Sequence, residues 1–133
     1  MRALVFAVLI LVISACATNP VPAPAPTVAG PTAGQLGDAG KAVFANRCAS
    51  CHGQNGQGVT APANIGPNAN LQKFSTAKGL YDYVSVSMPQ DAPGGLSPQE
   101  YLQLVSYLLV ENKFVKLDAP LDQGRLDGIA LKK

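Results

Sequence analysis

The sequence is poor in side chains that bind metals or move protons. It contains one histidine, His52, and two methionines, Met1 and Met88. A structural zinc site needs four ligands, and the chain offers only two closely spaced cysteines beside its single histidine. Acid–base catalysis most often uses histidine, so the supply of groups for it is thin. These shortages argue against a zinc site and against acid–base catalysis.

Charged side chains are scarce as well. They make up 14% of the residues, and the formal net charge at pH 7 is +2. Without residues 1–15, whose only charged side chain is Arg2, this charge falls to +1. Proteins that bind nucleic acid or steer anionic surfaces carry a much larger basic excess. We therefore expect no nucleic-acid partner.

The most specific motif of the chain lies at residues 48–52, which read Cys-Ala-Ser-Cys-His. Cys-x-x-Cys-His is the attachment signature of a c-type haem. Cys48 and Cys51 can add to the two vinyl groups as thioethers, and a helical turn places both sulfurs at one edge of the porphyrin. His52 then lies under the iron as its proximal ligand. A thioredoxin-like dithiol would need a preceding strand and a βαβ pattern, and neither is visible.

Met88 is the candidate for the second axial position of the iron. A mature chain without Met1 has one imidazole and one thioether, so His/Met ligation is the economical assignment. The alternative is an ordinary methionine that fills the core. Pro89 follows directly and two glycines lie at 94–95, which indicates a loop rather than a helix interior.

The first residues predict export and a lipid anchor. Residues 1–15 form a secretory signal whose apolar run is too short to span a bilayer comfortably. Residues 13–16, Ile-Ser-Ala-Cys, resemble the lipobox of bacterial lipoproteins, which predicts a lipid on Cys16. The alternative is a plain signal cut elsewhere, with Cys16 discarded or free. Lipidation of Cys16 and thioethers at the motif would leave no unpaired thiol outside the cell.

A tether follows the anchor at residues 16–36. Prolines recur at positions 20, 22, 24, 26 and 31 among small residues, and no core can be built from this composition. Such a segment favours extended polyproline II at about 3.1 Å per residue. Proline-rich segments also serve as recognition sites, but a spacer between an anchor and a domain needs no partner.

The remaining residues predict a small all-α domain over 37–112 with an extension over 113–133. Helices are expected from Asp38 to Cys51, from Ser75 or Thr76 to Ser85, and from Pro98 to about Asn112. In the third, a serine cap, a first-turn proline and a capping-box glutamate occupy positions 97, 98 and 100. Residues 53–70 predict a long functional loop. The simplest role of the extension is to wrap the domain.

Over residues 37–112 the chain resembles the class I cytochromes c. The resemblance rests on the order of an N-terminal helix with Gly40 and Phe44, the haem motif, the loop with Met88, and a C-terminal helix with Tyr107. It implies three main helices and long loops around one covalent haem c, with the terminal helices crossing at those small and aromatic positions. It also implies that the Pro67 carbonyl accepts a hydrogen bond from His52 Nδ1.

The resemblance implies a one-electron carrier rather than an enzyme. Residues 88–97 are similar to ligand loops of small bacterial cytochromes and of cytochrome subunits attached to periplasmic dehydrogenases. The expected partners are a dehydrogenase, a bc-type complex or a terminal oxidase, with no small-molecule substrate. The expected location is the extracytoplasmic side of a bacterial membrane, inner or outer. Two alternatives stay open: a haem peroxidase or gas sensor with a displaceable sixth ligand, and a lipoprotein that serves assembly.

Overall fold

The computed structural model describes residues 30–132, and within this range the regular structure is helical. Extended pairing there consists of isolated bridges, Thr32 with Pro120 and Thr76 with Ala130. The all-α prediction is confirmed. No helix in the described range is both long and apolar enough to cross a membrane. The elements in chain order are α1 Ala33–Arg47, α2 Ala49–His52, the 3₁₀ helix η1 Leu71–Phe74, α3 Ala77–Ser87, α4 Pro98–Glu111 and the 3₁₀ helix η2 Gln123–Gly128.

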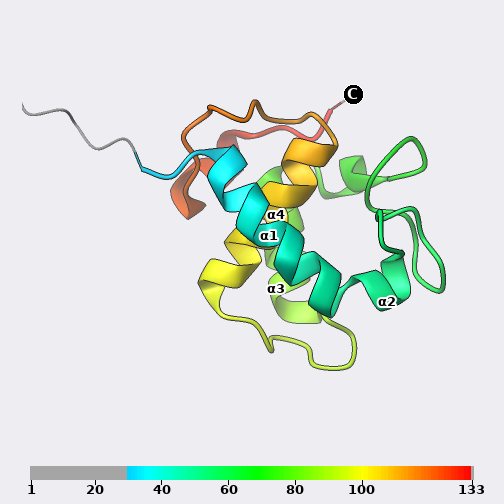
Figure 1. Cartoon of the computed structure of the whole chain (residues 1–133). Helices are drawn as coiled ribbons and strands as arrows, with labels where there is room; N and C mark the ends of the chain where they lie inside the picture. Colours follow the sequence, from blue (N-terminus) through cyan, green and yellow to red (C-terminus); the bar gives the residue numbers. More distant parts are fainter. Residues whose placement is uncertain (1–29, 133) are drawn as a thin grey trace, which may run out of the picture.

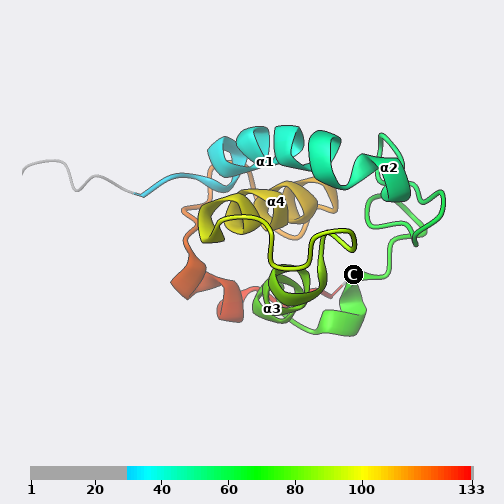
Figure 2. The ribbon, with the colours of Figure 1, turned by 90° about the horizontal axis from the view of Figure 1, so that it is seen from below.

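Helices α1 and α4 form the centre of the molecule, and Figures 1 and 2 show α1 lying across α4. Gly40 makes the close approach possible, because a Cβ there would collide with the Gln103 carbonyl of α4. One turn further along α1, the Phe44 ring packs on Tyr107 with centroids 5.5 Å apart. The expected crossing at a glycine and an aromatic pair is therefore confirmed.

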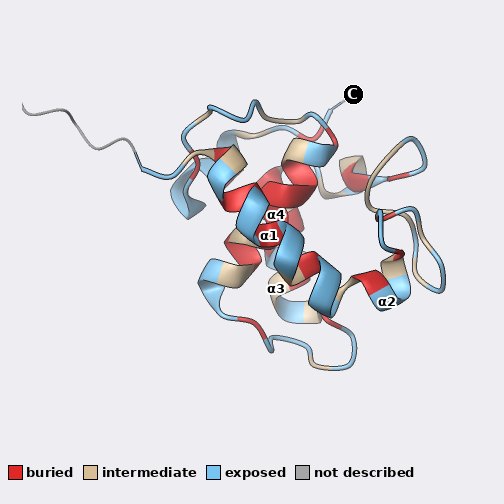
Figure 3. Cartoon of the chain, viewed as in Figure 1, coloured by how far each residue is buried: buried red, intermediate tan, exposed pale blue. Residues whose placement is uncertain are grey.

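Helix α4 begins as the sequence predicts. The Ser97 hydroxyl accepts the Glu100 N–H, and the Glu100 carboxylate accepts the Ser97 N–H, which completes a capping box. Most of the helix is buried, as the red ribbon of Figure 3 shows. Its buried residues are Tyr101, Leu102, Leu104, Val105, Ser106, Tyr107, Leu108 and Leu109.

Helix α3 is capped by Thr76 and packs against α4 through Leu80, Tyr81 and Val84. The Tyr81 ring meets the Tyr101 ring edge-on, with centroids 6.4 Å apart. The helix continues to Ser87, slightly beyond the predicted end. Met88 is therefore its C-cap residue.

The boundary between tether and domain needs correction, because residues 31–36 belong to the fold. Thr32 and Gln35 form a capping box at the start of α1, and Ala33 and Leu36 are buried. The proline-rich composition conceals this cap, so the sequence alone predicts a tether that continues to residue 36. The predicted signal, the predicted lipidation site Cys16 and the predicted tether up to residue 29 lie outside the described residues.

The C-terminal extension packs on the domain. Leu121, Leu126 and Leu131 are at most 2% exposed, at 2%, 0% and 1%. Its main chain also caps helices: the carbonyl of residue 119 accepts the N–H of residue 33 at 2.8 Å, and that of residue 129 accepts the N–H of residue 77 at 2.9 Å. The first N–H groups of a helix have no partner inside the helix. The extension therefore stabilises the starts of α1 and α3.

Candidate haem site

The haem motif lies on a short helical turn that is separate from α1. Cys48 is the shared cap between α1 and α2, with φ of −125°, so the single helix predicted over residues 38–51 is two segments. The His52 N–H donates to the Cys48 carbonyl at 2.9 Å. Positions three and four apart on a helical turn share one side. This places the side chains of Cys48, Cys51 and His52 toward the same cavity.

The orientation of His52 is set by the carbonyl of Pro62. The distance from His52 Nδ1 to the Pro62 oxygen is 2.7 Å, and because a carbonyl can only accept, Nδ1 is the donor. The expectation for Pro67 was therefore wrong. Pro67 lines a different pocket, together with residues at the end of α4.

The geometry of the loop explains why Pro62, and not Pro67, accepts the hydrogen bond from His52. Gly53, Gly56 and Gly58 all have positive φ, at 84°, 66° and 88°, so the chain reverses soon after the motif. The N–H groups of residues 59–61 then bond to the Cys51 carbonyl at 3.0–3.2 Å. This return over α2 brings Pro62 to the imidazole, before the Gly-Pro pair that suggested Pro67.

A second layer of contacts holds this loop. The Asn64 and Ile65 N–H groups both donate to the Gly56 carbonyl, at 2.9 and 3.0 Å. The buried Asn112 side chain at the end of α4 donates to the Asn64 carbonyl at 2.9 Å. Sequence analysis missed Asn112 because its only sequence signal was a polar residue at a helix end.

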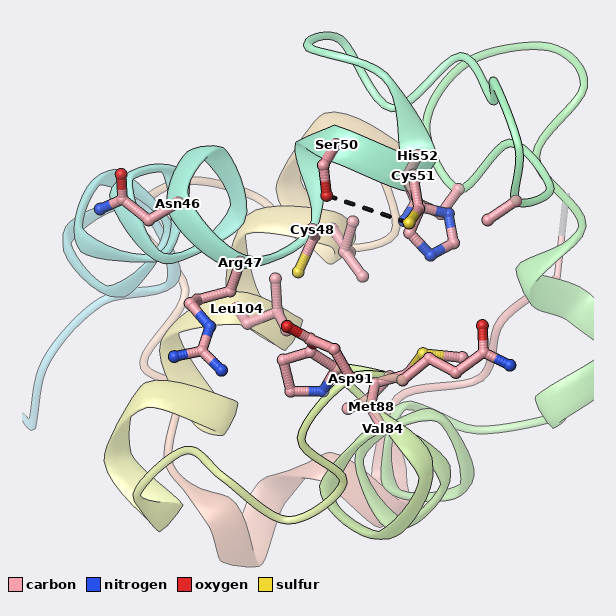
Figure 4. Close-up of a pocket in the computed structure, with 15 residues that line it drawn as sticks. Asn46, Arg47, Cys48, Ser50, Cys51, His52, Val84, Met88, Asp91 and Leu104 are labelled. Carbon is pink, nitrogen blue, oxygen red and sulfur yellow. Dashed lines mark hydrogen bonds between the residues drawn. The ribbon is translucent and has the colours of Figure 1, made fainter.

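The motif opens into a cavity of about 500 Å³, whose wall includes Cys48, Cys51, His52 and Met88. A second cavity of about 360 Å³ shares His52, Met88 and several other wall residues with the first. Cofactor sites fall in the range of roughly 300–1,000 Å³. In Figure 4 the His52 imidazole enters from α2, and the Met88 side chain enters from the facing side, at the end of α3.

Main-chain bonds fix the position of Met88. Its N–H donates to the Val84 carbonyl at 3.0 Å, as a C-cap residue does. Its carbonyl accepts the Tyr101 hydroxyl at 2.7 Å. The structure therefore brings four predicted site residues, Cys48, Cys51, His52 and Met88, to one cavity.

The two thiols of the motif lie in different environments. Cys48 is partly buried, and this burial raises the pKa of its thiol to about 11, with Arg47 opposing the shift. Cys51 is exposed, and neither thiol forms a disulfide within residues 30–132. The residues before them form α1 rather than a strand, unlike a thioredoxin-like motif. Across residues 30–132, no group of three or more His, Cys, Asp or Glu side chains is arranged to hold a metal ion.

The wall of the cavities suits a haem. Leu104, Leu108 and Val84 supply an apolar face. The Oδ1 atom of Asn64, which lines both cavities, is buried without a hydrogen-bond partner. The second cavity, whose wall does not include the thiols, adds polar groups on Asn68, Asn70 and Lys73. Thiols that can add to vinyl groups and polar side chains that can bind carboxylates match the chemistry of a haem.

Comparisons with known proteins show which family the chain belongs to. A family model described as Cytochrome c matches residues 37–110. A chain of the sulfane dehydrogenase SoxCD from Paracoccus pantotrophus has a TM-score of 0.62 and 26% identity, over 77% of this chain and 53% of that chain. A chain of the thiosulfate dehydrogenase TsdBA from Marichromatium purpuratum has a TM-score of 0.47 and 26% identity, over 54% of this chain and 17% of that chain. A search of curated proteins gives no match. The present chain spans about half the length of the SoxCD chain.

Proposed function

Because the chain belongs to the cytochrome c family and carries a covalent c-type haem, we propose that it is a one-electron carrier with His52 and Met88 as axial ligands. The observation that supports this proposal most directly is that the two side chains enter one cavity that also holds both thiols of the motif (Figure 4). The bound haem supplies the redox chemistry, as its iron alternates between the ferric and ferrous states.

On the proximal side, Pro62 orients the imidazole. Since Nδ1 of His52 donates to the Pro62 carbonyl, Nε2 is left as the nitrogen that binds iron. A carbonyl acceptor at Nδ1 also makes the ring a stronger donor to a metal. Pro62 therefore fixes the tautomer and the direction of the ligand.

On the opposite side, Met88 and the apolar wall raise the reduction potential. A thioether in place of a second imidazole shifts the potential of a haem upward. Leu104 and Leu108 keep water from the cavity wall, and a low-dielectric surrounding disfavours the additional positive charge of the ferric state. Both effects suit a carrier that accepts electrons readily.

In the second cavity, Lys73 and the amides of Asn68 and Asn70 would hold the haem carboxylates. In the wall of the first cavity, Cys51 and Ser50 are exposed. The electron would leave through this exposed edge to a partner that docks over a small, weak interface. The likeness to a chain of a sulfane dehydrogenase supports a dehydrogenase as that partner, ahead of a bc-type complex or a terminal oxidase.

We propose further that the protein is a lipoprotein on the extracytoplasmic side of a bacterial membrane, anchored through Cys16. The lipobox-like residues 13–16 support this, and the acyl chains of a bacterial lipoprotein give stable anchoring. The described chain begins beside the start of α1, at the opposite end of that helix from α2 (Figure 1). Replacing Cys16 by Ser should release the protein into the soluble extracytoplasmic fraction. Recovery of the wild type as a soluble, unlipidated protein would contradict the anchor.

The absorption spectrum tests the axial ligands. The oxidised holoprotein should be low-spin and show the weak long-wavelength sulfur-to-iron charge-transfer band. Met88→Ala should abolish this band, lower the potential, and allow carbon monoxide or cyanide to bind rapidly. A wild-type protein that is high-spin and binds carbon monoxide quickly would instead support the peroxidase or gas sensor.

A further inference from the structure

One buried hydroxyl joins the two ends of the loop that carries Met88. Tyr101, in the second turn of α4, is 3% exposed. Its hydroxyl donates to the Met88 carbonyl with an oxygen–oxygen distance of 2.7 Å. The same oxygen accepts the Leu96 N–H at 3.4 Å. The first and last residues of the 88–96 segment are thus connected to the same side chain.

The packing of α3 on α4 explains why the hydroxyl reaches this point. The Tyr81 ring of α3 contacts the Tyr101 ring edge-on, which brings the end of α3 beside the first turns of α4. Carbonyls at a helix end have no partner within the helix. The Met88 carbonyl, at the C-cap of α3, receives its donor from Tyr101.

The bonds inside the loop are short-range. The Ala92 N–H donates to the Pro89 carbonyl at 3.0 Å, and the Gly95 N–H donates to the Ala92 carbonyl at 2.9 Å. These turns shape the segment but do not connect it to the helices. Its polar connection to α4 runs through Tyr101, whose ring is held by the core.

We propose that Tyr101 is a positioning residue for Met88: its hydroxyl fixes the backbone from which the thioether reaches the iron. This inference rests on the proposed ligation by Met88. Without the hydroxyl, the thioether still reaches the iron, but it leaves the iron more often. An external ligand such as cyanide can bind the iron only after the thioether has left. Cyanide therefore binds faster when the thioether leaves more often.

Tyr101→Phe in the haem-loaded protein tests this role, with Tyr81→Phe as the matched control. The control removes a hydroxyl from the contacting ring, one that donates to the Pro98 carbonyl at 3.4 Å and not to Met88. For Tyr101→Phe, the ferric protein should keep the sulfur-to-iron band but bind cyanide roughly three to ten times faster, the factor expected when one hydrogen bond is lost. Tyr81→Phe should bind cyanide at the wild-type rate.

Two further measurements keep the outcomes distinct. Replacing Tyr101 by 4-aminophenylalanine restores a donor at the same position and should return cyanide binding toward the wild-type rate. Thermal unfolding of each variant separates a loosened ligand from general loss of stability. If Met88→Ala leaves the charge-transfer band unchanged, the proposed ligation itself fails. If Met88→Ala abolishes the band but Tyr101→Phe binds cyanide at the wild-type rate, the role of Tyr101 alone is refuted.

Discussion

The loops on the two sides of the proposed haem are held by different means. On the His52 side, residues 53–70 return to the motif through main-chain hydrogen bonds to Cys51, His52 and Gly56. That segment contains no ionisable side chain. On the Met88 side, residues 88–97 form two local turns and reach α4 through the Tyr101 hydroxyl and the Ser97 cap.

This difference indicates which loop can be loosened while the other loop stays folded. Several backbone hydrogen bonds hold the loop around His52, so the loss of one side chain leaves that ligand in place. Around Met88, the backbone is held by the bond of its N–H to the Val84 carbonyl and by the Tyr101 hydroxyl. Both loops nevertheless depend on α4, because Asn112 at its end holds Asn64 while Tyr101 near its start holds Met88. These residues lie roughly 16 Å apart along the helix, at about 1.5 Å per residue.

The largest effect is expected from removing the thiols that attach the haem. Cys48→Ala combined with Cys51→Ala should leave no haem on the protein after acid-acetone extraction, when both forms are made in a host with c-type maturation. Mass spectrometry of the denatured chain measures this. The control is Ser50→Ala, which removes a hydroxyl beside Cys51 but no sulfur. Retention of covalent haem by the double variant would overturn the attachment.

The next largest effect tests the backbone restraint on the His52 side. Gly56 has φ of +66°, and a Cβ there would lie 2.6 Å from Asn64 Oδ1. Gly56→Ala should cost roughly 2–4 kcal/mol, because strain of about 1–3 kcal/mol adds to the cost of the clash. Gly66→Ala is the matched control, since Gly66 has φ of +91° but no atom within 4 Å of the added Cβ. Equal losses in urea unfolding would mean that the contact with Asn64 contributes nothing.

A smaller effect should follow the loss of the Asn112 amide, which donates to the carbonyls of Asn64 and Leu108 at 2.9 Å each. Asn112→Ala should destabilise the protein by about 1–3 kcal/mol, the cost of unpaired buried polar groups. Cyanide binding should stay near the wild-type rate, since the Met88 loop is untouched. The opposite result, faster cyanide binding with unchanged stability, would contradict the inference that Asn112 supports the His52 side and not the Met88 side.

Local chemistry made much of this site predictable from the sequence. The haem motif is set by spacing alone, and α4 begins where a serine, a proline and a glutamate dictate a cap. The crossing of α1 and α4 was implied by the resemblance to the class I cytochromes c, and the structure gives its reason, because a Cβ at Gly40 would collide with α4.

The contacts that join distant segments were not predictable. The choice of Pro62 over Pro67 depends on three glycines with positive φ, whose combined path a residue pattern does not specify. Tyr101 belongs to the apolar face of α4, so its periodicity predicts burial but not the hydrogen bond to Met88. The extension caps α1 and α3 with carbonyl groups, which every residue possesses and no sequence signal marks.

The smallest effect concerns the stability of the folded protein at acid pH. It should arise at the start of α4, beside the Met88 loop. The Ser97 N–H and hydroxyl donate to the Glu100 carboxylate and hold its pKa below the ordinary value of 4.5. A carboxyl whose pKa is lower in the folded state stabilises that state above its unfolded pKa, and this contribution fades as the pH falls below 4.5 through the folded value.

Glu100→Gln should therefore lower the urea midpoint slightly at neutral pH and converge on the wild type in acid. The comparison of these two proteins from about pH 6 to about pH 3 cancels the titration of the other carboxylates, which both share. Ser97→Ala should reproduce the effect by removing the hydroxyl that donates to the same carboxylate, together with the cap itself. Residues 53–70 cannot titrate, so this pH dependence belongs to the Met88 side of the molecule. If the urea midpoints of wild type and Glu100→Gln change with pH in parallel, the capping carboxylate contributes no acid sensitivity. The loops on the His52 and Met88 sides would then differ only in how their backbones are held.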